Sequence, residues 1–203
     1  MVKIKICGIT NLEDALFSFF SGADAIGFVF YKKSPRFIEP LKAGNISRIL
    51  PKKTLKVGVF VDEKPARVKK IARLCKLGAL QFHGNESAEY CNKFKGYKVI
   101  KAFRIKNNLD LPGILKYKTF GYLFDAFSKN LAGGTGKKFN WNLLKNIDKI
   151  GGQVFLSGGL SSANVKGALN KLHPDWVDVS SGVESSSGEK SHKKIKKFIE
   201  AIR

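Results

Sequence analysis

The stretch KIKICGITNLEDALFSFF, residues 3–20, passes from one structural pattern to another and decides how the chain folds. Charged and apolar residues alternate over residues 2–7, and this period of two predicts a strand that ends at Cys7. A helical stripe of apolar residues follows: Leu12, Ala15, Leu16, Phe19 and Phe20. Thr10 and Glu13 have the spacing of a capping box, so we expect Thr10 to cap this helix.

The same strand-and-helix unit recurs along the rest of the chain. Eight short runs rich in apolar residues predict strands: 2–7, 25–30, 56–61, 79–82, 98–103, 121–124, 153–156 and 176–179. Helical spacing separates them, and a last helix places Ile195, Phe198, Ile199 and Ile202 on one face. Such alternation implies parallel strands in either an open doubly wound sheet or a closed barrel. Eight repeats favour closure, so we expect an α/β fold, a single compact (β/α)8 TIM barrel over residues 1–203.

The length and composition agree with such a barrel. A chain of 203 residues is short for this fold, so we expect compact loops, and little regular helix over residues 105–118, where Pro112 and Gly113 interrupt the pattern. No very long apolar stretch and no secretory signal are visible, which predicts a cytoplasmic protein that does not enter membranes. The three cysteines form no CxxC pair and are expected to be free thiols.

The formal net charge of +21 admits a second class of function, nucleic-acid binding. Most of the basic residues are lysines scattered through nearly every segment, whereas base readers and phosphate clamps depend on arginine. We therefore expect no specific nucleic-acid partner, although the charge attracts anionic substrates. Four lysines of the last helix form either a solvated face or a phosphate-binding face: Lys193, Lys194, Lys196 and Lys197.

The predicted strand interiors are nearly all apolar, but chemically active residues follow the strands. In a barrel these positions converge on one mouth. Cys7 is either a buried structural thiol or a base, and Asp125 either caps a turn or serves as the matching acid. Arg36 forms either a surface ion pair or a carboxylate site. His83 is either structural or orients a substrate.

The last two strands lead into small, flexible sequences. SGGL contains Gly158 and Gly159, and DVSSG contains Ser180 and Ser181. Glycine allows backbone N–H groups to approach an anion closely, and many barrels bind phosphate at these two loops. Together they predict a phosphorylated small-molecule substrate.

An ordered series of motifs resembles the phosphoribosylanthranilate isomerase family of tryptophan biosynthesis. The motifs are KICGIT, GADAIGFVF, SPR, VGVFV, QFHG, FDA with GGTGKKFNW, SGGL and DVSSGVESSSGEK. They extend from residue 3 to about residue 190 in the family's order. The resemblance implies a cofactor-independent Amadori rearrangement of N-(5-phosphoribosyl)anthranilate to 1-(2-carboxyphenylamino)-1-deoxyribulose 5-phosphate.

The resemblance also implies roles for individual residues. Cys7 is expected to be the general base and Asp125 the general acid, while Arg36 would hold the anthranilate carboxylate. His83 and Asp178 would contact substrate, and the loops after the last two strands would hold its phosphate.

The sequence leaves three matters open. The main rival is a related barrel isomerase of the histidine pathway. A resemblance to that family would imply an Asp–Asp pair across the barrel mouth, and Cys7 argues against it. The chain could be a monomer or a homodimer. Residues 127–140 form either a lid or merely a flexible loop.

Overall fold

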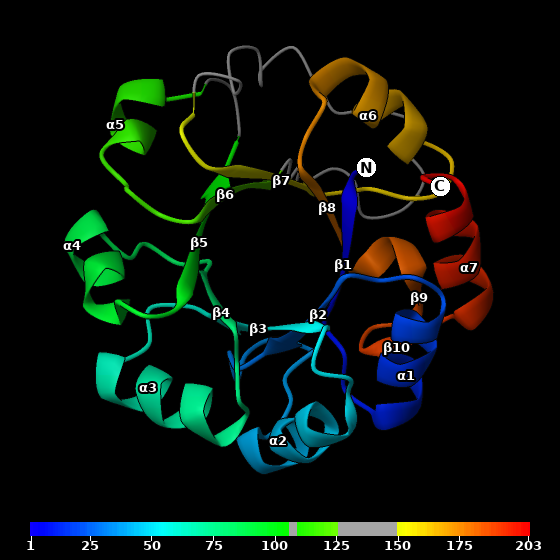
Figure 1. Ribbon diagram of the computed structural model, residues 1–203, viewed down its shortest axis with the longest axis horizontal. Coiled ribbons are helices and arrows are strands. Elements are labelled where there is room, and N and C mark those ends of the chain that lie inside the picture. Colours follow the sequence, from blue (N-terminus) through cyan, green and yellow to red (C-terminus); the bar gives the residue numbers. More distant parts are fainter. Residues whose placement is uncertain (106–108, 126–149) are drawn as a thin grey trace.

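The protein is a closed barrel of eight parallel strands with its helices on the outside (Figure 1). The computed structural model describes residues 1–105, 109–125 and 150–203. Its barrel strands are β1 Lys3–Cys7, β2 Ala25–Val29, β3 Leu55–Phe60, β4 Ala79–Phe82, β5 Lys98–Arg104, β6 Gly121–Asp125, β7 Gln153–Ser157 and β8 Trp176–Val179. Each strand pairs with the next, and β8 pairs with β1 to close the ring. The predicted (β/α)8 fold is confirmed, and all eight strands lie within two residues of their expected bounds.

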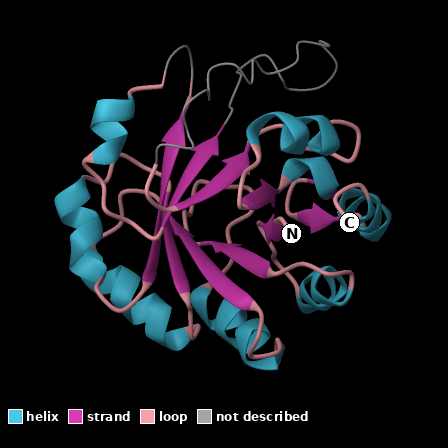
Figure 2. Ribbon diagram, turned by 45° about the horizontal axis from the view of Figure 1, so that its top comes forward, coloured by secondary structure: helices cyan, strands magenta, loops and turns pink. Residues whose placement is uncertain are grey.

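The helices pack around the strands and shield the outer surface of the barrel (Figure 2). They are α1 Leu12–Phe20, α2 Pro40–Ile49, α3 Pro65–Leu74, α4 Ala88–Cys91, α5 Leu111–Leu115, α6 Val165–Leu172 and α7 His192–Glu200. A small antiparallel pair, β9 Glu184–Ser186 and β10 Glu189–Lys190, lies between β8 and α7. Along the parts of the chain described, none of the helices has the length and apolar character needed to cross a membrane.

The barrel interior changes from apolar to polar along its axis. Apolar side chains fill the end where the strands begin: Ala25, Val57, Ala79, Ile100, Ala102, Leu123, Phe155 and Trp176. Nearer the carboxyl ends, Lys5, Gln81 and Asp178 are buried inside the barrel. This layer therefore differs from the nearly apolar strand interiors expected from the sequence. Its polar groups can be buried because ion pairs and hydrogen bonds satisfy most of them.

Helix α1 differs from its sequence prediction at both ends. Asn11, not Thr10, caps the helix, because the Asn11 side chain accepts a hydrogen bond from the Asp14 backbone N–H at 2.8 Å. The Thr10 hydroxyl instead donates to the Gly188 carbonyl at 2.6 Å. Phe20, expected on the buried face, is 78% exposed where the helix ends.

The last helix and the region around Pro112 follow the prediction more closely. In α7, Ile195, Phe198 and Ile199 are buried, and its four lysines are exposed. Only the five-residue helix α5 forms within the described part of residues 105–118. The candidate lid, residues 127–140, lies outside the described residues.

Candidate active site

The carboxyl ends of the barrel strands surround a cavity of about 330 Å³. Every residue singled out from the sequence lines this cavity: Cys7, Arg36, His83, Asp125, Gly158, Gly159, Asp178, Ser180 and Ser181. A larger hollow of about 950 Å³ lies at the opposite end of the barrel, lined mainly by lysines and aromatic residues. We place the site in the smaller cavity because a thiol and a carboxylate suited to proton transfer both face it.

Cys7 ends β1 at a point where two glycines are needed, one for the backbone turn and one to leave room for the thiol. Gly8 has a φ of +77°, and a Cβ there would lie 2.6 Å from Cδ of Arg36. Gly27 on the neighbouring strand leaves room for the thiol, since a Cβ there would lie 2.8 Å from Sγ of Cys7. The Gly-Ile-Thr turn therefore lets the chain leave the barrel without displacing Arg36.

An ion pair lies next to this thiol inside the barrel. Lys5 is fully buried, and its ammonium donates to Oδ1 of Asp178 at 2.7 Å. Ser157 donates to the other oxygen of the same carboxylate at 3.1 Å. Burial raises the pKa of the Cys7 thiol above its ordinary value, and the Lys5 charge opposes that rise. The structure thus pairs Asp178 with Lys5, and the contact of Asp178 with substrate stays a prediction.

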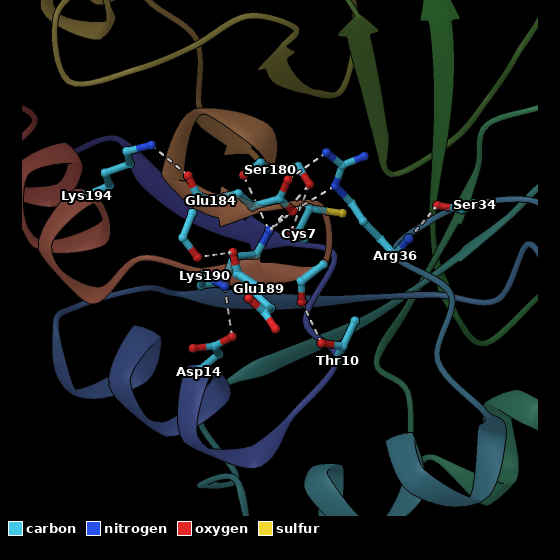
Figure 3. Close-up of polar contacts among 12 residues, drawn as sticks. Cys7, Thr10, Asp14, Ser34, Arg36, Ser180, Glu184, Glu189, Lys190 and Lys194 are labelled. Atoms are coloured by element: carbon cyan, nitrogen blue, oxygen red, sulfur yellow. Dashed lines mark hydrogen bonds and ion pairs between the residues drawn. The ribbon is translucent and has the colours of Figure 1, made fainter.

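A second charged cluster surrounds Arg36 (Figure 3). Its Nε and Nη2 donate to the two oxygens of Glu184 at 2.7 and 2.6 Å. Buried Lys190 donates to Glu184 at 2.7 Å and approaches the Ser180 carbonyl at 3.3 Å. Burial would raise the pKa of Glu184, but the hydrogen bonds from Arg36 and Lys190 hold it below its ordinary value. One edge of the guanidinium is therefore occupied, and Nη1 remains outside this bidentate contact.

Asp125 lies at the end of β6 with a single histidine beside it. Nε2 of His83 is 3.2 Å from Oδ2 of Asp125, and Nδ1 of His83 is 3.0 Å from the Gln81 amide nitrogen. With that amide donating to Nδ1, a neutral His83 carries its proton on Nε2 and donates it to Asp125. The Gln81 carbonyl oxygen is buried without a hydrogen-bond partner.

The two predicted phosphate loops face the cavity from adjacent strands. Gly158 and Gly159 have φ values of +90° and +64°, which glycine adopts readily. Asn164 holds their loop by donating to the Gly159 carbonyl at 2.8 Å. In the second loop, the Ser180 hydroxyl donates to the Cys7 carbonyl at 3.1 Å and so connects the loop to β1.

Four polar residues near the site were missed as candidates from the sequence: Lys5, Gln81, Glu184 and Lys190. Two of them carried a usable signal. Lys5 precedes Cys7 by two positions and Gln81 precedes His83 by two, so each pair leaves its strand on the same side. Glu184 and Lys190 gave no such signal, because they belong to the β9–β10 hairpin, whose position against Arg36 depends on the tertiary fold.

This combination defines a class of protein, the (β/α)8-barrel enzymes whose site lies at the carboxyl ends of their strands. Among the described residues, no group of three or more His, Cys, Asp or Glu side chains is arranged to hold a metal ion. The model of the N-(5'-phosphoribosyl)anthranilate (PRA) isomerase family matches residues 4–201. The chain belongs to this family of tryptophan-biosynthesis enzymes and is an isomerase of the aldose–ketose type.

Individual relatives are similar over nearly the whole chain. The N-(5'-phosphoribosyl)anthranilate isomerase of Trichlorobacter lovleyi is 47% identical over 199 residues, which cover 98% of this chain and 97% of the relative. The crystal structure of the Thermotoga maritima isomerase has a TM-score of 0.92 and 48% identity, covering 99% of this chain and 98% of the other.

A third relative contains a ligand. This phosphoribosylanthranilate isomerase, with a TM-score of 0.89 and 45% identity, was crystallised in complex with reduced 1-(o-carboxyphenylamino)-1-deoxyribulose 5-phosphate. The alignment covers 99% of this chain and 98% of that structure.

Proposed function

We propose that Cys7 and Asp125 are the general base and general acid with which this chain converts N-(5'-phosphoribosyl)anthranilate to 1-(2-carboxyphenylamino)-1-deoxyribulose 5-phosphate. The observation that carries the proposal is their shared cavity: Cys7 ends β1, Asp125 ends β6, and both face the same opening. The ligand of the relative has the two anionic groups, a carboxylate and a phosphate, that such a site must recognise.

Each end of this substrate has a matching group in the cavity. Nη1 of Arg36, which takes no part in the bidentate contact with Glu184, would donate to the anthranilate carboxylate. The loops of Gly158–Gly159 and Ser180–Ser181 lie where barrels commonly bind phosphate, and they would hold the 5'-phosphate. These two contacts would place the sugar between Cys7 and Asp125.

The chemistry then requires two proton transfers. Asp125, as a carboxylic acid, protonates the ring oxygen of the furanose while the nitrogen lone pair forms C1=N and the C1–O bond breaks. The Cys7 thiolate removes the C2 proton of the resulting protonated Schiff base, and the released electron pair forms the C1=C2 bond of an enolamine. Protonation at C1 and loss of the proton from the C2 hydroxyl give the ketose. His83 holds the Asp125 carboxyl in position through the 3.2 Å contact.

The test follows the loss of anthranilate-type fluorescence when purified protein is added to freshly generated substrate. We expect rapid conversion by the wild type, and a decrease in kcat of about 10²-fold to 10⁴-fold in both Cys7→Ser and Asp125→Asn. Cys91→Ser is the matched control, because Cys91 is also a buried thiol but lies at the end of α4, outside the cavity. Near-normal turnover by Cys7→Ser would exclude Cys7 as the base.

A folded wild-type protein that leaves this substrate unchanged would contradict the proposal as a whole. The aminoaldose of the histidine pathway would then be tested as the substrate.

A further inference from the structure

Lys5 is a buried charge that the proton transfers described above do not use. Its side chain has no exposed surface, and Asp178 forms a 2.7 Å ion pair with it. Removing an ammonium group from water costs several kcal/mol, and an ion pair often only offsets that cost. An apolar residue would fill this position in a barrel more simply. The retained charge therefore suggests a task beyond packing.

The side chains of Lys5 and Cys7 leave β1 on the same side. They are two residues apart on β1, so both side chains leave the strand toward the barrel interior. Asp178 comes from β8, the strand paired with β1, where it is opposite Lys5 in the register. The Lys5 side chain therefore lies on the same side of β1 as a thiol that must become an anion during turnover, with its ammonium paired to Asp178.

The charges around Cys7 favour one additional anion. Lys5 on β1, Lys190 on β10 and Arg36 in the β2–α2 loop are cationic. Asp178 on β8 and Glu184 on β9 are their anionic partners. His83 and Asp125 lie across the cavity as a separate pair. Among the described side chains, three cations against two carboxylates leave one positive charge unbalanced beside the thiol, and Lys5 is the cation that lies on the same strand and the same side as Cys7.

We propose that Lys5 is a positioning residue that supplies the counter-charge for the Cys7 thiolate, while Asp178 limits how much of that charge reaches the sulfur. This inference rests on the proposed role of Cys7 as the base. Lys5 keeps all of its protons: its ammonium hydrogen-bonds the thiolate before the reaction. When the sulfur takes the C2 proton, the ammonium stays paired with Asp178. Asp178 thus acts through Lys5 on the base.

Lys5 and Asp178 should have opposite effects on one measurable property, the pKa of Cys7. The pKa is obtained from the pH dependence of alkylation by iodoacetamide, with the modified peptide identified by mass spectrometry. Lys5→Met should raise the pKa, because the cation that opposes the effect of burial most strongly is then gone. Asp178→Asn should lower it, because the remaining ammonium is no longer shared with a carboxylate.

Two double variants keep the test valid if a lone buried charge prevents folding. Lys5→Met/Asp178→Asn removes the whole pair and should still raise the pKa of Cys7, because Lys5 acts on the thiol more strongly than Asp178 does. The matched control is Lys101→Met/Glu86→Gln, which removes another buried ion pair, from β5 on the far side of the barrel. The control should leave the pKa of Cys7 unchanged.

Two results would overturn the proposal and leave Lys5 with a structural role only. One is a shift of the Cys7 pKa in the same direction in both single variants, and the other is an unchanged pKa in the Lys5→Met/Asp178→Asn double variant. This outcome is distinct from failure of the proposed function. If Cys7 is not the base, Cys7→Ser stays active, whatever the alkylation experiment shows.

Discussion

The base side and the acid side of the cavity are built differently. Cys7 is buried and lies among two ion-paired clusters, centred on Lys5 and on Arg36. Asp125 is partly exposed, and its hydrogen-bond partner among the described side chains is His83. A buried thiol resists ionisation, so the base side needs fixed charges. A carboxyl group near solvent needs mainly to be oriented.

The largest expected difference between the two sides is in pH dependence. A thiolate base becomes more abundant with pH, about tenfold per pH unit below its pKa, and burial places the pKa of Cys7 above the ordinary thiol value. Where removal of the C2 proton limits turnover, the rate follows this abundance; where ring opening limits it, as expected in Asp125→Asn, the rate does not. kcat/KM of the wild type should therefore rise with pH below the pKa of Cys7, while the profile of Asp125→Asn stays flatter. A steeper rise in Asp125→Asn than in the wild type would contradict the comparison.

A smaller effect is expected when the cluster around Arg36 is weakened. Glu184→Gln removes the charge that holds two of the guanidinium nitrogens, so Arg36 becomes less ordered in its contact with the substrate carboxylate. KM should rise about tenfold, equivalent to about 1.4 kcal/mol of binding, with a smaller change in kcat. Glu189→Gln on β10 is the control, since that exposed carboxylate contacts only Ser186 among described side chains. Equal kinetic constants for Glu184→Gln and Glu189→Gln would show that Glu184 does not contribute to substrate binding.

The smallest effect is expected on the acid side. Gln81→Met removes the amide that contacts His83, together with a buried carbonyl oxygen that has no partner. His83 then orients Asp125 less well, but removal of the unsatisfied oxygen compensates in stability. We expect kcat to fall about threefold, with the thermal unfolding temperature unchanged or higher. A loss as large as that of Asp125→Asn would mean that the acid side depends on fixed neighbours as strongly as the base side does.

The sequence predicted the barrel well because its strands and helices are encoded locally. Residues 79–82 and 176–179 have the bounds of β4 and β8, since short, mainly apolar runs mark strands that are buried on both sides. The error at Thr10 has a local cause and a non-local one. Asn11 and Thr10 are both good capping residues, and the contact between Thr10 and Gly188 joins residues far apart in the chain.

The site was only partly predictable. Cys7 and Asp125 could be placed at one mouth because parallel strands end on the same side of a barrel. The pairing of Arg36 with Glu184 could not, because it joins a loop after β2 to a hairpin after β8. Ion pairs of this kind depend on the completed fold, and no spacing rule in the sequence describes them.

The assignment of Cys7 as base and Asp125 as acid is tested most directly by the kinetic effect of deuterium at C2 of the substrate. Only the step that breaks the C2–H bond is slowed by deuterium. In Cys7→Ser, where that step becomes limiting, turnover should be markedly slower with the deuterated substrate. In Asp125→Asn, where ring opening becomes limiting, the two substrates should react at nearly equal rates. The reverse pattern, with deuterium sensitivity in Asp125→Asn and none in Cys7→Ser, would contradict the assignment of Cys7 as base and Asp125 as acid.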